Sequence, residues 1–99
     1  MNEYKYWIDP KCYEKIFSFY HNVALKYKNT YSEELMHQNI DEAIDSIFQI
    51  EKTLQRRKPT LLKWASYHMA NTDKWYYAYI VMDDIIAVVD ACHAQNMHD

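Results

Sequence analysis

The residues best suited to chemistry stand at the C-terminal end of the chain, where an apolar stretch runs into HAQNMHD, residues 93–99. His93 carries an imidazole that titrates near neutrality and can act as a general acid or base. Gln95 and Asn96 carry amides that both donate and accept hydrogen bonds. The alternative is a strand end fraying into water, because a single histidine at a strand end more often has a structural role.

Charge is unevenly distributed along the chain, although the formal net charge is only −3. Residues 29–51 carry six acidic side chains and no Lys or Arg, whereas residues 52–74 carry six basic side chains and only one acid. A basic segment of this kind can bind an anionic partner. The alternative is solvated faces of opposite sign, and Arg56, Arg57 and Lys58 also fit a simple charge cluster at a helix C-terminus.

Composition argues against several classes of site. The chain has no glycine, which rules out the phosphate-binding loops of P-loop and Rossmann proteins. The histidines and cysteines show no metal-ligand spacing, so we expect no metal and no cofactor. Cys12 and Cys92 fit reduced thiols, no apolar run approaches the ~20 residues of a membrane span, and the N-terminus lacks a signal-peptide core. We therefore expect a cytoplasmic protein with no membrane partner.

Two helices are expected in the first half of the chain from its apolar period. Asp9 can cap a helix that begins with Pro10 and runs to about residue 28. A second helix restarts at NTYSEE, where Thr30 and Glu33 form a capping-box pattern, and ends at RRKP, residues 56–59. The short link between them predicts an antiparallel helical hairpin.

The rest of the chain has strand character, with aromatic and β-branched residues in alternation. The expected strands are residues 4–8, 61–69, 74–82 and 85–92. We expect a turn at residues 71–73 and a two-residue loop at Asp83-Asp84, since without glycine a positive φ must fall on Asn or Asp. The last two strands are apolar on both faces and should lie centrally, with the first strand at an edge or beside the last strand.

These elements predict one α+β domain over residues 1–99, in the order β-α-α-β-β-β. The helical hairpin should pack on one face of a mainly antiparallel four-stranded sheet. Together with local motifs, this order resembles the RelE/ParE toxin superfamily of bacterial type II toxin–antitoxin modules over nearly the whole chain. The motifs are YWIDPKCYEKI, IFQIEKTLQRRKP and WYYAYIV followed by IIAVVDACHAQNMHD. In that family the last strand commonly ends in a histidine followed by short polar residues and Asp, here His93 and Asp99.

The resemblance implies metal-independent cleavage of mRNA in the ribosomal A site, which stops translation. The ribose 2′-OH attacks the adjacent phosphate, so the site needs a proton acceptor, a proton donor and cations. The catalytic candidates are His93, His68 and Lys63. The RNA-binding candidates are Arg56, Arg57, Lys58, Lys74, Gln95 and Asn96.

Three functions remain open at this point. The first is a ribosome-dependent mRNA endoribonuclease, whose partners are the ribosome and mRNA, and the acid–base candidates His93 and His68 favour it. The second is a ParE-like inhibitor of DNA gyrase with no enzymatic activity of its own, and the third is a non-toxic family member that acts only as a binding partner. The acidic net charge favours these two, as does Lys74-Trp75 where the family often has a Tyr-Arg pair. In each case the resemblance implies a cognate antitoxin protein.

Overall fold

The computed structural model describes residues 4–53, 61–72 and 74–97. Its strands are β1 (Lys5–Ile8), β2 (His68–Thr72), β3 (Trp75–Met82) and β4 (Ile85–His93). Its long helices are α1 (Pro10–Lys26) and α2 (Glu33–Ile47), and its short helical turns are α3 (Ile50–Thr53), η1 (Leu62–Trp64) and η2 (Ala94–Asn96). The order of strands and long helices is the predicted one.

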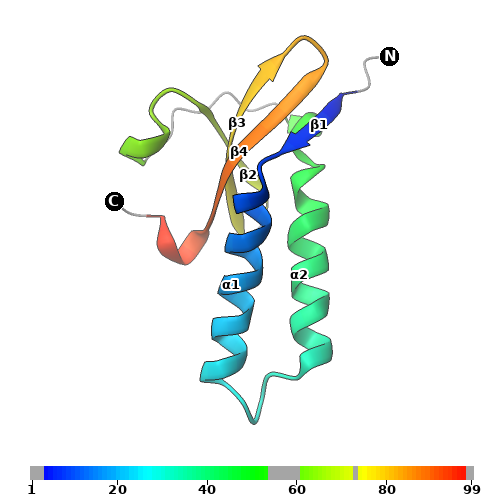
Figure 1. Ribbon diagram of the computed structural model, residues 1–99, viewed down its shortest axis with the longest axis vertical. Helices are drawn as coiled ribbons and strands as arrows, with labels where there is room; N and C mark the ends of the chain where they lie inside the picture. Colours follow the sequence, from blue (N-terminus) through cyan, green and yellow to red (C-terminus); the bar gives the residue numbers. More distant parts are fainter. Residues whose placement is uncertain (1–3, 54–60, 73, 98–99) are drawn as a thin grey trace.

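The four strands form one sheet in the order β1-β4-β3-β2. β4 and β2 both pair antiparallel with β3, whereas β1 lies parallel to β4 at one edge of the sheet. α1 and α2 run side by side as a hairpin and pack on one face of the sheet (Figure 1). The predicted α+β arrangement is therefore confirmed, including central positions for the last two strands and a first strand that lies at an edge, beside the last.

The two long helices begin at side-chain caps, but only one cap is the expected one. The Asp9 carboxylate accepts a hydrogen bond from the Lys11 backbone N–H at 3.0 Å, ahead of α1. α2 is capped by Ser32, whose hydroxyl accepts from the Leu35 backbone N–H at 3.1 Å, so the capping box predicted from Thr30 is wrong. Thr30 instead belongs to the turn, because its backbone N–H donates to the Tyr27 carbonyl at 3.1 Å.

Both helices end earlier than their apolar stripes suggest. α1 stops at Lys26, and α2 stops at Ile47 before the separate turn α3. The Tyr6 hydroxyl explains why α2 is separated from α3. It donates to the Phe48 carbonyl and accepts from the Glu51 N–H, both at 3.1 Å, and these bonds interrupt the regular helical hydrogen bonding. The helix end predicted at residues 56–59 lies outside the described residues.

Among the described residues, no helix is long and apolar enough to cross a membrane.

The main core lies between the helical hairpin and the sheet. α1 supplies Cys12, Ile16 and Tyr20, and α2 supplies Met36, Ile40, Ala43 and Ile47. From the sheet, Trp75, Tyr77 and Tyr79 on β3 face this core together, as the two-residue period predicted. The buried Tyr77 hydroxyl keeps a partner by donating to the Ala43 carbonyl at 2.9 Å, so its burial leaves no polar atom unsatisfied.

The opposite face of the sheet is covered by the segment before β2, where a strand was predicted. Residues 61–67 form η1 and turns, and β2 begins only at His68. Trp64 explains the difference, because its indole is buried in a second apolar cluster with Leu61, Met69 and Ala78. Tertiary burial of one large side chain thus overrides the local strand preference. β2 also runs through Thr72, so residues 71 and 72 of the turn predicted at 71–73 belong to the strand, and residue 73 lies outside the described residues.

A β-bulge in β4 decides which side chains face the helices. Val88 pairs with Tyr79, but Asp90 pairs with Ala78, so β4 carries one extra residue at this point. Beyond the bulge, Ala91 packs in the main core and Asp90 lies opposite Ala78, on the other face. A regular strand would have turned His93 away from the helices, whereas the bulge turns it toward α1.

The hairpin between β3 and β4 is the predicted two-residue loop at Asp83-Asp84. Asp83 adopts a φ of 56°, in the left-handed region that glycine usually occupies. Aspartate tolerates this region better than most residues, so the expectation that Asp or Asn must replace glycine at such a turn is confirmed.

Candidate functional site

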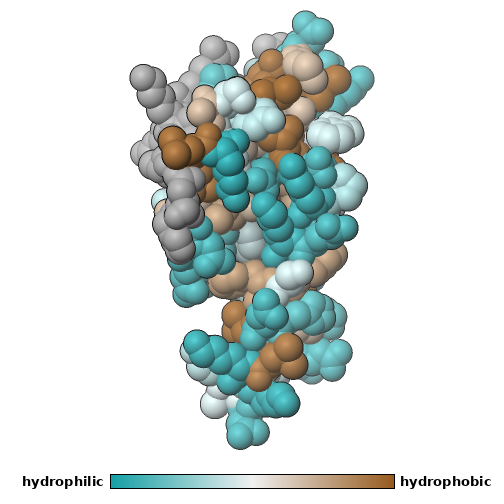
Figure 2. Space-filling view, turned by 60° about the vertical axis from the view of Figure 1, so that its left-hand side comes forward, coloured by the Kyte–Doolittle hydropathy of each residue, from teal (hydrophilic) through white to brown (hydrophobic). Residues whose placement is uncertain are grey.

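A groove runs between α1 and the C-terminal end of β4. It consists of two adjoining cavities of about 400 Å³ and 530 Å³, which share Phe19, Asn22, His93 and Asn96 as walls. We call the larger one the tyrosine cavity, because Tyr27 and Tyr31 of the α1–α2 turn line it. In Figure 2 the molecule is hollowed just above the tip of the helical hairpin. The last residues of the described chain therefore meet the hairpin across an open depression.

His93 lies at the centre of this groove and is held from several sides. Its ring stacks on Phe19, with ring centroids 3.9 Å apart and planes 13° apart, and it meets the Trp75 ring edge-on at 5.3 Å. Its Nδ1 accepts the backbone N–H of Gln95 at 3.1 Å, which makes His93 the N-cap of η2. Only 8% of the residue is exposed. The histidine therefore fixes the path of the chain after β4.

The same contacts define the charge and the tautomer of His93. Burial lowers the pKa of His93 below its usual value, and the positive charge of Lys74 lowers it further. The ring is therefore neutral at pH 7. Because Nδ1 acts as an acceptor, the geometry assigns the ring proton to Nε2. In this state His93 can donate from Nε2, and it takes up a proton on Nδ1 only by giving up the Gln95 hydrogen bond.

Four of the residues selected from the sequence meet in the tyrosine cavity: Lys74, His93, Gln95 and Asn96. Lys74 immediately precedes β3, and its carbonyl accepts the Ala94 N–H at 2.8 Å. This bond ties the start of β3 to the start of η2. Gln95 and Asn96 are exposed, so their amides are accessible to a ligand. One histidine, one cation and two amides among the predicted site residues therefore line one cavity.

Other predicted residues lie elsewhere. His68 on β2 pairs with Tyr79, four positions along β3 from the Trp75 that pairs with His93. At ~3.4 Å per residue and ~4.8 Å per strand, the two histidines lie roughly 17 Å apart. Lys63 is exposed in η1, in the segment that covers the sheet face turned away from the helices. Arg56, Arg57 and Lys58 lie outside the described residues.

The sequence did not single out the helical side of the tyrosine cavity. That side includes Lys26, Tyr27, Tyr31 and Asn39. Lys26 Nζ lies 5.5 Å from the centroid of the Tyr27 ring, and the Tyr31 hydroxyl accepts the Asn39 side-chain N–H at 2.6 Å. The only signal in the sequence is the cluster KYKNTY at the helix turn, which is also explained by core packing or a protein interface.

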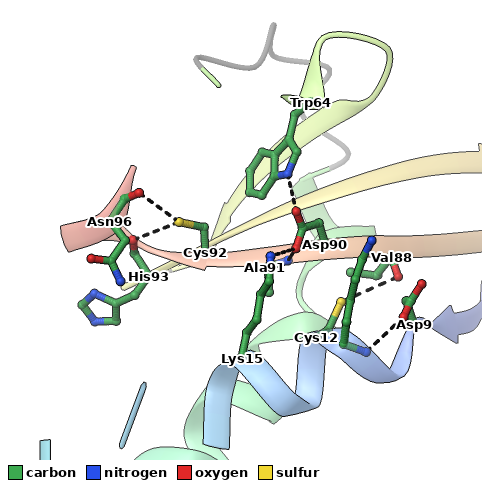
Figure 3. A network of polar contacts seen from close by, with 11 residues as sticks. Asp9, Cys12, Lys15, Trp64, Val88, Asp90, Ala91, Cys92, His93 and Asn96 are labelled. Carbon is green, nitrogen blue, oxygen red and sulfur yellow. Dashed lines mark hydrogen bonds and ion pairs between the residues drawn. The ribbon is translucent and has the colours of Figure 1, made fainter. Parts of the chain in front are cut away.

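Asp90 links the groove to the far face of the sheet, as Figure 3 shows. One carboxylate oxygen pairs with Lys15 of α1, and the other accepts the Trp64 indole N–H at 2.7 Å. Burial opposes ionisation of Asp90, but the hydrogen bonds from Lys15, Trp64 and Ala91 outweigh it and hold the pKa of Asp90 below its usual value. Asp90 was not among the residues predicted from the sequence, because its position depends on the bulge.

Cys92, beside His93 in the chain, is half-buried next to the groove. Its thiol donates to the Asn96 carbonyl at 3.3 Å, which further fixes the tail. Burial raises the pKa of Cys92, although the nearby charges of Lys63 and Lys15 oppose the shift. The thiol is thus protonated at pH 7 and serves as a structural donor.

The electrostatics of the tyrosine cavity favour an anion. Among the described residues that line it, Lys26 and Lys74 are cationic and none is acidic. No group of three or more His, Cys, Asp or Glu that could hold a metal ion occurs among the described residues.

Comparison of the chain with protein-family models, curated proteins and solved structures found no match. What the groove binds is therefore inferred from its own chemistry.

Proposed function

We propose that this protein is the toxin of a bacterial type II toxin–antitoxin module of the RelE/ParE kind, and that it cleaves mRNA on the ribosome without a metal ion. The observation that carries the proposal is the meeting of His93, Lys74, Gln95 and Asn96 in one cavity free of acidic residues among its described walls. A cognate antitoxin that covers the protein is part of the proposal.

The groove supplies chemical groups that such a reaction needs. When the ribose 2′-OH attacks the adjacent phosphate, negative charge builds on the phosphate oxygens, and Lys26 and Lys74 are placed to stabilise it. His93 donates a hydrogen bond from Nε2 to a phosphate oxygen in its resting state. To accept the 2′-OH proton on Nδ1 it must release Gln95, which costs about 1–3 kcal/mol if the N–H is left without a partner. The P–O5′ bond breaks as the O2′–P bond forms, and the imidazolium of His93 then returns the proton to the departing 5′-oxygen.

The amides of Gln95 and Asn96 complete the site from the exposed side. They follow His93 in η2 and line the same cavity. Amides of this kind read the edge of an unpaired base or a ribose hydroxyl. They favour single-stranded RNA over a simple anion such as free phosphate.

The proposal is tested by expressing the chain alone in bacteria and mapping mRNA 5′ ends by primer extension. We expect growth arrest and new ends inside translated regions, in phase with codons. The matched variant is His93→Asn, whose side-chain oxygen can still cap η2 but which has neither a titratable ring nor the Nε2 proton. This variant should fold and should lose cleavage. Growth arrest without new mRNA ends would contradict the nuclease proposal.

A second candidate, inhibition of DNA gyrase without catalysis, is favoured by one observation. The stacking, capping and burial of His93 together give it a complete structural role in holding the tail. A gyrase supercoiling assay run beside the primer extension separates the two functions. Poisoned gyrase with intact mRNA selects the second candidate, and neither effect selects a non-toxic binding partner.

A further inference from the structure

The α1–α2 turn contributes two aromatic rings to the groove that the proposed reaction does not use. We infer that Tyr27 is a stacking platform for one base of single-stranded RNA, whose neighbouring phosphate binds Lys26 and Lys74. The inference rests on the proposed function and adds a substrate-contacting residue to the same site. It assigns to Tyr27, in the hairpin turn, a role in substrate binding that is separate from the proton transfer at His93.

Tyr27 has the exposure that stacking needs. It is the C-cap residue of α1, with φ −121° and ψ 50°, and it leaves the helix direction there. Half of the residue is exposed, at 50%, while it also lines the cavity. A large ring exposed in this way contributes little to the core. A base that stacks on it would remove apolar surface of both partners from water.

The turn is ordered before any ligand arrives. The Tyr27 carbonyl accepts the backbone N–H groups of Thr30 and Tyr31 at 3.1 and 2.9 Å, which closes the turn on itself. The Tyr31 ring is then held in place by the hydrogen bond between its hydroxyl and Asn39 of α2, at 2.6 Å. Because these contacts fix the backbone of the turn, ligand binding has little more than the Tyr27 side chain to order.

The charges beside Tyr27 suit a nucleotide. Lys26 Nζ lies over one face of the Tyr27 ring, 5.5 Å from its centroid, so a base would stack on the opposite face, with its phosphate within reach of this ammonium group. Lys74 lines the same cavity from the sheet side. A paired base in a duplex already stacks on its neighbours and cannot reach Tyr27, so the site selects a single strand.

The test is fluorescence anisotropy of the full chain with a labelled single-stranded RNA octamer, with the matching duplex as competitor. Tyr27→Ala and Tyr27→Leu should each weaken binding about tenfold or more, because both remove the flat π face. Tyr27→Leu keeps apolar bulk at an exposed position and guards against a folding defect. Tyr27→Phe should bind within about twofold of wild type, because the stacking face is kept.

Trp7→Ala is the matched control, since Trp7 is an equally exposed aromatic, at 51%, outside the groove. It should bind RNA like wild type. Wild-type affinity in Tyr27→Ala and Tyr27→Leu would overturn the inference and leave the cleavage proposal standing. A duplex bound as tightly as the single strand would overturn it too. Tyr27-dependent binding by a chain that cuts no mRNA would support the inference while the nuclease proposal fails.

Discussion

His93 connects α1, β3 and the tail through three different kinds of contact. It stacks on Phe19, meets Trp75 at the ring edge and caps η2 through Nδ1. None of these contacts requires a charged ring, and burial together with Lys74 lowers its pKa. The fold therefore stabilises the neutral imidazole of His93, and protonation of the ring destabilises the fold.

We predict that protonation of His93 destabilises the fold at acidic pH. The folded pKa lies below the unfolded value of about 6.5, so the unfolded chain binds more protons between the two values. This contribution to stability is present above about pH 6.5 and is lost as pH falls toward the folded pKa. Urea unfolding of wild type and His93→Asn at about pH 7.5 and 5.5 measures it.

Wild type should lose more unfolding free energy over this interval than His93→Asn, since the two proteins differ only at this residue. Equal losses in the two proteins would contradict a neutral, capping His93.

A second prediction at the residue scale concerns the hydrogen bond between Trp64 and Asp90. Trp64→Phe keeps an aromatic ring in the second apolar cluster. It removes the indole N–H that donates to the Asp90 carboxylate at 2.7 Å. The buried carboxylate then loses one partner, and the unfolding free energy should fall by about 1–3 kcal/mol. Trp7→Phe at an exposed site is the control and should change stability by less than about 0.5 kcal/mol. Equal effects from the two variants would show that the hydrogen bond contributes nothing.

At the scale of elements, most of the fold follows from local pattern. The apolar stripe of α1 and the alternation in β3 are periodic enough to identify helix and strand directly. The predicted elements are wrong where a contact distant in sequence determines the local structure. Burial of Trp64 favours η1 where a strand was predicted, and the Tyr6 hydroxyl interrupts the helix after Ile47. The bulge at Val88–Asp90 was also not predicted, because β4 is apolar on both faces and its alternation carries no register signal.

The start of α2 offers a test of how caps are chosen. The sequence analysis predicted Thr30 as the cap, but Ser32 is the residue whose hydroxyl accepts the Leu35 N–H. Ser32→Ala should lower the unfolding free energy by about 1 kcal/mol, whereas Thr30→Ala should leave it within about 0.5 kcal/mol. Thermal or urea unfolding of both variants measures this difference. A larger loss for Thr30→Ala would restore the capping box predicted from the sequence.

At the scale of the whole molecule, β4 organises both the fold and the groove. It pairs with β1 and β3, contacts α1, and carries Asp90, Cys92 and His93 at the end that β1 leaves uncovered. The sequence predicted Lys74, His93, Gln95 and Asn96 because they are close in the chain or at strand ends. It missed Tyr27 and Tyr31, since the hairpin places them opposite η2 only through the packing of α1 against the sheet.

The central claim is that the groove around His93 cuts mRNA, and reconstituted translation complexes test it most directly. Purified wild-type protein is added to ribosomes stalled with a defined codon in the A site, and the mRNA is resolved by length. We predict a single cut at that codon, made without a metal ion bound to the protein. The rate of cutting should be at least about 10²-fold lower with His93→Asn. An uncut message with wild type, or equal cutting by wild type and His93→Asn, would contradict the account.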